Sequence, residues 1–156
     1  MEINSLSLIR SSRITKLAIF VAIGLIIIAT LFGPRIVSLV LTKPSPILYG
    51  PSRSVVLYLS GYSSALLALA CLFCLYQLIR RLEQDNVFTP ENITTLRYIR
   101  YLLFVETLIA LITAGLTYLP FVVIPLASGF MGLIIKVIEE AFKRAYLMQT
   151  ELDQVI

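Results

Sequence analysis

Four long apolar runs decide what this chain can fold into. They cover about residues 17–41, 55–79, 101–119 and 121–138. A helix needs about 20 mostly apolar residues to cross a hydrocarbon core of about 30 Å, a length that the last two runs reach with help from their flanks. Hydrocarbon offers no water to pair with free peptide groups, so each run must be helical. The sequence therefore predicts an all-α membrane protein, residues 1–156, with four transmembrane helices as two antiparallel hairpins.

Composition supports this fold class. Hydrophobic residues make up 58% of the 156 residues, and the mean hydropathy is +0.91. Both values are too high for an ordinary soluble domain. The β-branched cluster at residues 26–28 does not indicate a strand, because its run is long and shows no alternation of apolar and polar residues.

A polar joint at residues 80–100 separates the two predicted hairpins. Within it, Thr89 is a typical helix N-cap, Pro90 suits the first helical position, and Glu91 is favourable in the first turn. We expect the third helix to begin at Pro90 in water and to continue into the membrane. The fourth helix is predicted to continue past the membrane as an amphipathic C-terminal helix over residues 139–156.

The basic residues are divided unequally between the two sides of the predicted membrane. Of the 13 Lys and Arg residues, 10 lie before the first run, in the joint or after the fourth run, and three lie between the first two runs. The positive-inside rule then places both termini and the joint in the cytoplasm, with the chain in the plasma membrane. Because this division accounts for the net charge of +4, no nucleic-acid partner is predicted.

Residue types that support catalysis or metal binding are scarce. Histidine is absent, and the two cysteines, Cys71 and Cys74, lie inside the second apolar run without a second ligand pair. We interpret them as small apolar packing residues. No set of nucleophile, base and oxyanion donor can be assembled. The chain is therefore predicted not to be an enzyme, with no catalytic residue, metal or cofactor.

A stripe of small residues follows one face of the second predicted helix: Ser60, Gly61, Ser64, Ala65 and Ala68. Small residues let helix backbones approach closely in lipid. We expect this stripe to pack inside the subunit, with self-association as the alternative.

Glu106 is the only acid inside an apolar run, so it should face the bundle interior and have a partner. It lies 14 residues before Pro120, where the chain turns, and Lys136 lies 16 residues after it. At about 1.5 Å per residue the two are at similar depth. A second set is also at similar depth: Arg100 lies 20 residues before Pro120, and Glu139 and Glu140 lie 19 and 20 residues after it. The sequence thus predicts two intramembrane ion pairs between the third and fourth helices, with a proton or cation site at Glu106 as the alternative.

Apolar residues recur at alternating spacings of three and four after Lys136, which is typical of a coiled-coil seam. They are Ile138, Ala141, Ala145, Met148, Leu152 and Val155. We expect Ala141, Ala145 and Met148 to pack on Ile93, Leu96 and Arg97 of the third helix, with Phe88 at the lower end of this stub. Leu152 and Val155 would then remain available to a partner.

The start of the third helix resembles a known family. Its residues Phe88, Thr89, Asn92, Leu96, Arg97 and Ile99 are similar to the run Phe-Thr-x-x-Asn, then Leu-Arg-x-Ile, of the bacterial membrane proteins in domain-of-unknown-function family 2975. The C-terminus, residues 151–156, is similar to the family's ending in Glu, Asp and a final Ile, although Gln154 and Val155 depart from its usual Leu and Thr. The resemblance implies a four-helix membrane protein, often encoded beside a small helix-turn-helix regulator. It implies no established activity.

Two functional hypotheses follow. The first is a regulatory or interaction protein that presents the joint and the C-terminal helix to a cytoplasmic partner, because most of the patterned polar sequence lies there. The alternative is a small oligomeric transporter or channel that uses Glu106. The lipid bilayer, a cytoplasmic regulator protein and a second copy of the chain are the expected partners.

Overall fold

The computed structural model describes residues 2–84 and 87–155. Its elements are α1 (Glu2–Leu31), α2 (Gly33–Leu41), α3 (Pro51–Leu82), α4 (Pro90–Leu116), the 3-10 helix η1 (Leu119–Val122) and α5 (Val123–Val155). Asp85 and Asn86 of the predicted joint and Ile156 of the C-terminal match lie outside the described residues.

Four helical stretches are long and apolar enough to cross a membrane: Ser12–Leu31, Pro51–Leu82, Pro90–Leu116 and Leu119–Val155. Large apolar side chains are exposed along them, for example Leu25, Leu66 and Leu126. Such a surface suits lipid rather than water. The predicted fold class, an all-α membrane protein with four spanning helices, is confirmed.

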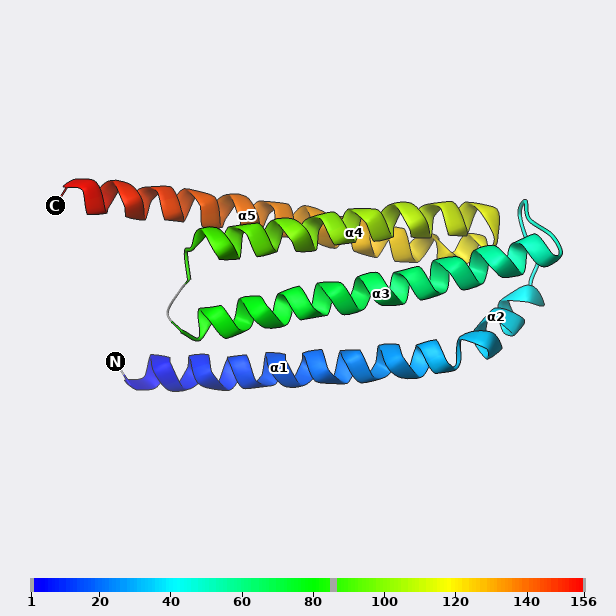
Figure 1. Cartoon of the computed structure of the whole chain (residues 1–156), viewed down its shortest axis with the longest axis horizontal. Coiled ribbons are helices and arrows are strands. Elements are labelled where there is room, and N and C mark those ends of the chain that lie inside the picture. Colours follow the sequence, from blue (N-terminus) through cyan, green and yellow to red (C-terminus); the bar gives the residue numbers. More distant parts are fainter. Residues whose placement is uncertain (1, 85–86, 156) are drawn as a thin grey trace.

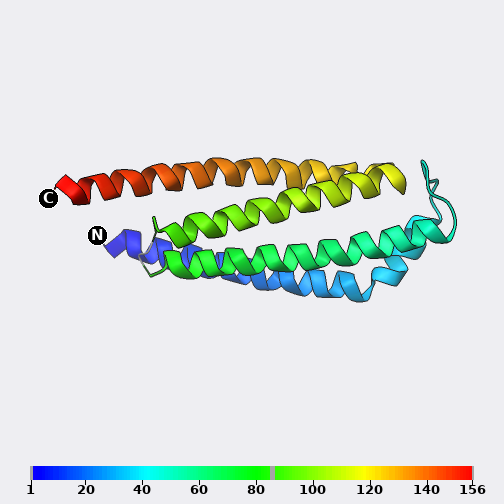
Figure 2. The ribbon, with the colours of Figure 1, turned by 45° about the horizontal axis from the view of Figure 1, so that its top comes forward.

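The helices form an open row rather than a closed bundle (Figures 1 and 2). Helix α3 packs on α1 and α4, and α4 packs on α3 and α5. Among the described residues, no Cα atom of α1 lies within 8 Å of a Cα atom of α4 or α5. Helix α1 is therefore held from one side only.

The first predicted span is divided into two helices. Helix α1 ends at Leu31, and α2 begins at Gly33 with Pro34 in its first turn. Proline has no backbone N–H, and its ring restricts the residue before it, so a continuous helix is disfavoured at this point. Pro34 thus accounts for the break between α1 and α2.

Helix α4 lies at the centre of the packing, because it has a neighbour on each side. Many of the buried apolar side chains of the described residues belong to it: Ile93, Leu96, Ile99, Ala110 and Ala114. The core therefore runs along the contacts of α4 with α3 and α5.

Helices α4 and α5 approach closely through two glycines. A Cβ atom built on Gly132 would lie 3.1 Å from the ring of Phe104, and one built on Gly129 would lie 3.3 Å from Thr107. Beside them, the hydroxyl oxygens of Thr107 and Ser128 are 2.9 Å apart. This contact fixes which face of α5 meets α4.

Candidate functional site

The joint and the start of α4 form what we call the polar end of the helix row. Thr89 is in an extended conformation, and its hydroxyl accepts a hydrogen bond of 3.4 Å from the Asn92 N–H. Pro90 is the first residue of α4, and Glu91 lies in the first turn. The predicted cap is confirmed, and it satisfies one of the free donors at the helix start.

Other residues of the joint motif, Phe88–Ile99, hold the start of α4 in place. Asn92 is fully buried, and its side-chain amide donates to the Val87 carbonyl at 2.9 Å. The Phe88 ring meets the ring of Phe142 on α5 edge to face, with centroids 5.3 Å apart, as expected for the lower end of the stub. Leu96 is only 2% exposed. These residues have structural roles: they close the joint and hold α4 against its neighbours.

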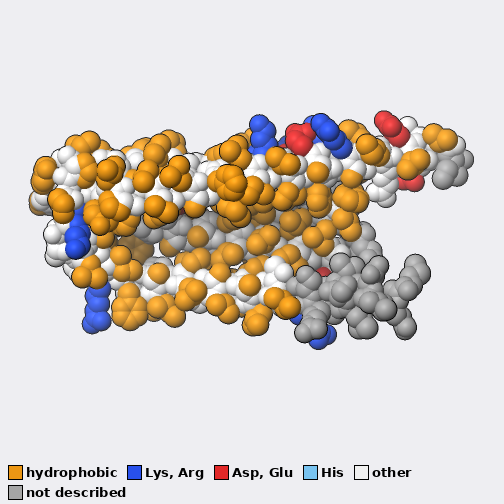
Figure 3. Space-filling model, turned by 180° about the vertical axis from the view of Figure 1, so that it is seen from behind, with side chains coloured by type: hydrophobic (Ala, Val, Ile, Leu, Met, Phe, Trp, Pro, Cys, Tyr) orange, Lys and Arg blue, Asp and Glu red, His pale blue; other side chains and the backbone are white. Residues whose placement is uncertain are grey.

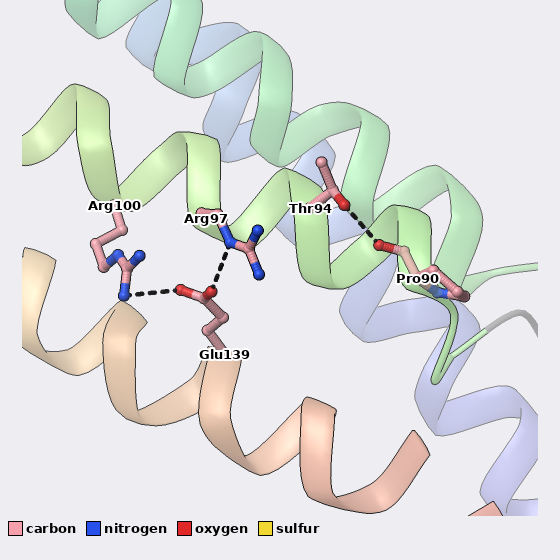
Figure 4. A network of polar contacts seen from close by, with 5 residues as sticks. All are labelled: Pro90, Thr94, Arg97, Arg100 and Glu139. Atoms are coloured by element: carbon pink, nitrogen blue, oxygen red, sulfur yellow. Dashed lines mark hydrogen bonds and ion pairs between the residues drawn. The ribbon is translucent and has the colours of Figure 1, made fainter. Parts of the chain in front are cut away.

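Glu139 of α5 joins α4 through two arginines (Figure 4). Arg97 Nε donates to Glu139 Oε1 at 3.1 Å, and Arg100 Nη1 lies 3.1 Å from Glu139 Oε2. The Glu139 side chain is 6% exposed and that of Arg100 15%. The predicted pairing of Arg100 with Glu139 is confirmed, whereas Glu140 is exposed and forms none of the ion pairs in the described structure.

The second predicted ion pair, between Glu106 and Lys136, is wrong. Lys136 is exposed and forms none of the ion pairs of the described residues, and Glu106 lines a cavity together with Ser64 of α3 instead. Counting residues from Pro120 gave the depth of each side chain but not its direction. Successive helical residues differ by about 100°, and Thr107, the next residue, is the one that contacts α5. Glu106 therefore turns toward α3.

A cavity of about 670 Å³ lies between α1, α2, α3 and α4, and we call it the open groove. Figure 3 shows the hollow between the layer of α4 and α5 and the layer below it. The small-residue stripe lines this groove: Ser60, Gly61, Ser64, Ala65 and Ala68. A Cβ atom built on Gly61 would have no heavy atom within 4 Å. The stripe thus faces the interior of the helix row, where Ser60, Ser64, Ala65 and Ala68 are partly buried, but no other helix packs against it at Gly61.

Tyr62 lies next to Gly61, where the stripe is uncovered. Its hydroxyl oxygen would lie 3.5 Å from a Cβ atom on Gly33, at the break between α1 and α2. Its ring stacks with that of Tyr58, with centroids 6.3 Å apart. Large side chains thus flank the small residues at this end of the stripe.

Among the described residues, Glu106 is the only acidic one that lines the open groove. Its Oε2 atom is buried and has no hydrogen-bond partner in the described part of the chain. Among the residues whose side chains the structure describes, no Lys or Arg lines the groove, and the walls are mostly apolar. In this part of the chain, the groove thus combines apolar walls with a single carboxyl group that has no lining cation beside it.

The last turns of α5, residues 147–155, extend past the start of α4 and form what we call the α5 overhang (Figures 1 and 2). Its large apolar side chains are all exposed: Leu147, Met148, Leu152 and Val155. Leu152 and Val155 are thus uncovered, as expected from the seam.

The rest of the seam does not pack as predicted. Helix α5 contacts α4 through the row that includes Gly132, Glu139 and Phe142. Ala141 and Met148 lie about 100–120° around the helix from Phe142, and both are exposed. The expected packing of Ala141 and Met148 on α4 is therefore wrong, because the close approach at Gly132 rotates these two positions outward, whereas Ala145, about 60° from Phe142, is partly buried.

Arg53, one of the three basic residues between the first two apolar runs, organises the end of the row opposite the polar end. It is 5% exposed, and it donates to the carbonyls of Lys43 at 2.8 Å, Val40 at 3.1 Å and Thr117 at 3.0 Å. These carbonyls end α2 and α4, where a cation is favourable. Ser45 binds the Leu116 carbonyl beside it. An arginine in the first turn of an apolar helix was the available signal.

The chain offers little for metal chemistry. No group of three His, Cys, Asp or Glu side chains that could hold a metal ion is found in the described residues. Cys71 and Cys74 are free thiols in α3, both partly buried, and Cys71 lines the open groove.

Comparison with known proteins identifies a family. Neither the curated proteins nor the solved structures contain a significant match to the chain. The family described as "Protein of unknown function (DUF2975)" matches residues 15–156. This range includes the joint motif at Phe88–Ile99 and almost all of the four spanning stretches. The chain therefore belongs to the DUF2975 family.

Proposed function

We propose that this chain is a multi-pass plasma-membrane protein of regulatory or interaction type, which binds a partner protein through its α5 overhang. The observation that carries this proposal is the exposure of Leu147, Met148, Leu152 and Val155 on a helix that extends beyond α4. Exposed apolar side chains are expected where helices face lipid. On the part of a helix that extends beyond the hydrocarbon core, they are typical of an interaction surface.

The charge distribution supports a cytoplasmic position for this surface. Ten of the 13 basic residues lie at the polar end or in the flanking segments on the same side, which the positive-inside rule assigns to the cytoplasm. Lys143 and Arg144 stand at the base of the overhang and are exposed. The overhang would then stand in water directly below the lipid headgroups.

The form of the overhang indicates how a partner would bind. It is a single helix with apolar residues at spacings of three and four, which suits insertion into an apolar groove of another protein. The family resemblance implies a small helix-turn-helix regulator as the first partner to examine. A second copy of the chain is the other.

The test is purification from the native host in a gentle detergent, followed by mass determination of the intact complex. We expect a cytoplasmic protein to copurify with the wild-type chain and to be lost from Leu152→Glu. Thr150→Glu is the matched control, since it adds the same charge to the overhang about 160° around the helix from Leu152. An intact complex in Leu152→Glu would contradict the proposal.

A small oligomeric transporter or channel is the second candidate function. The open groove with its unneutralised Glu106 favours it, because Lys136 does not supply the counter-charge. Ion or solute flux through liposomes that contain only this protein would support it. Flux retained in Glu106→Gln would contradict a role for the carboxyl group.

A further inference from the structure

We propose that the open groove binds a hydrophobic cation and that Glu106 is its counter-ion. The groove lies within the helix row, away from the α5 overhang, so this binding site and the partner site can be tested separately.

The charge balance of the groove points to a cation. Glu106 Oε2 is buried without a hydrogen-bond partner, and no Lys or Arg of the described side chains lines the cavity. The nearby arginines of α4, Arg97 and Arg100, are both engaged by Glu139. A carboxylate in an apolar environment is costly unless a positive charge pairs with it. A bound cation would supply the charge that the chain itself does not.

The walls of the groove favour a bulky apolar ligand over an inorganic ion. The volume of about 670 Å³ lies in the range of roughly 300–1,000 Å³ that is usual for small-molecule sites. Tyr58 and Tyr62 line it with rings inclined by only 13° to one another, and ring faces attract organic cations. A strongly hydrated metal ion would find one carboxyl group and few other oxygens. The fitting class is a quaternary ammonium or phosphonium with apolar substituents.

The position of Glu106 suits a ligand that arrives from the bilayer. Ten residues separate it from Leu116 at the end of α4, which is about 15 Å along the helix and half of a hydrocarbon core of about 30 Å. The groove is open because α1 does not reach α4. A cation that partitions into lipid can therefore enter between these helices.

The test uses the full chain in lipid nanodiscs with radiolabelled tetraphenylphosphonium as the probe. We expect saturable binding by the wild type and an affinity at least about tenfold lower in Glu106→Gln, because the counter-ion is lost. Glu140→Gln is the matched control: it removes the same charge from an exposed position outside the groove and should bind like the wild type. Equal affinity in Glu106→Gln, or equal affinity of the wild type for uncharged triphenylphosphine oxide, would overturn the proposal.

A second pair of variants does not depend on Glu106 and decides the matter if Glu106→Gln fails to fold. Gly61→Leu should fill the groove and abolish binding, since nothing lies within 4 Å of the Cβ position. Gly115→Leu makes the same exchange at an exposed position that is equally open and does not line the groove, so it should bind normally. Undiminished binding by Gly61→Leu would overturn the proposal. So would a groove occupied by a second copy of the chain, seen as intermolecular cross-links from Ser64 together with absent probe binding.

Discussion

The two sides of the helix row are held together very differently. Helix α5 meets α4 over glycine contacts at Gly129 and Gly132 and over the buried ion pairs of Glu139. Helix α1 meets α3 through fewer contacts, which include the edge-to-face packing of Phe20 on Tyr76, with centroids 6.0 Å apart, and ion pairing at the polar end. One side is closed, and the other leaves the open groove.

Small residues in a membrane helix permit close packing without ensuring it. Gly132 and Gly61 are both in apolar helices, yet only Gly132 has a side chain of the next helix against it. A small residue permits a close approach, but the residues beside it decide whether the approach occurs. On α3, the residue next to Gly61 is the bulky Tyr62, whose hydroxyl lies near Gly33 at the break between α1 and α2. Small-residue stripes are therefore weak evidence for packing until the bulky neighbours are considered.

The largest expected effect comes from breaking the closed side at Glu139. Glu139→Gln leaves Arg97 and the mostly buried Arg100 without a carboxylate, which should lower the free energy of unfolding by about 3 kcal/mol. The measurement is unfolding by sodium dodecyl sulfate in mixed micelles. Glu140→Gln, at the exposed neighbouring position, should change stability by less than about 0.5 kcal/mol. Equal effects of the two substitutions would contradict the role of Glu139.

A pair of glycine substitutions sharpens the comparison directly. Gly132→Ala should destabilise by about 1–3 kcal/mol, because its Cβ would press on the Phe104 ring. Gly61→Ala should be neutral or stabilise by up to about 1 kcal/mol, because its Cβ meets only open space and alanine favours the helix. The same unfolding assay measures both. Destabilisation by Gly61→Ala as large as that by Gly132→Ala would show that the α1 side is also closed.

The smallest expected effect concerns the polar tie of α1 to α3. Lys16 and Ser12 donate to Glu83, and these hydrogen bonds hold the pKa of the Glu83 carboxyl below its usual value of 4.5. Because the folded pKa is lowered, this tie stabilises the fold above pH 4.5 and is lost as the pH falls through the folded pKa. Thermal unfolding of the wild type and Glu83→Gln should differ at pH 7 and converge in acid. A difference that does not change with pH would contradict this role.

Features that depend on position along the chain could be predicted from the sequence. The four apolar runs gave the spanning helices, the Thr89–Pro90 pair gave the start of α4, and equal distances from Pro120 gave the pairing of Arg100 with Glu139. Each of these features follows from residue types or from the number of residues along the chain, and the rise per helical residue converts that number into a depth in the membrane.

Features that depend on the rotation of a helix could not be predicted in the same way. Glu106 is at the depth of Lys136 but faces the groove beside α3, and Ala141 and Met148 of the seam turn away from α4. Rotation is set by the closest contacts, such as Gly132 with Phe104, which involve two helices at once. Arg53 was missed for a related reason: its partners are carbonyl groups, which carry no signal in the sequence.

The most direct test of the open row is disulfide formation between paired cysteines in native membranes, in a chain with Cys71 and Cys74 replaced by alanine. We expect Thr107→Cys with Ser128→Cys to cross-link readily, because their hydroxyl oxygens are 2.9 Å apart. Ile26→Cys with Ala110→Cys, on opposite walls of the groove, should not cross-link. No Cα atom of α1 is within 8 Å of one in α4 among the described residues, and a disulfide needs less than about 7 Å. Efficient cross-linking of Ile26→Cys with Ala110→Cys within one chain would show that the bundle is closed, and it would contradict the account.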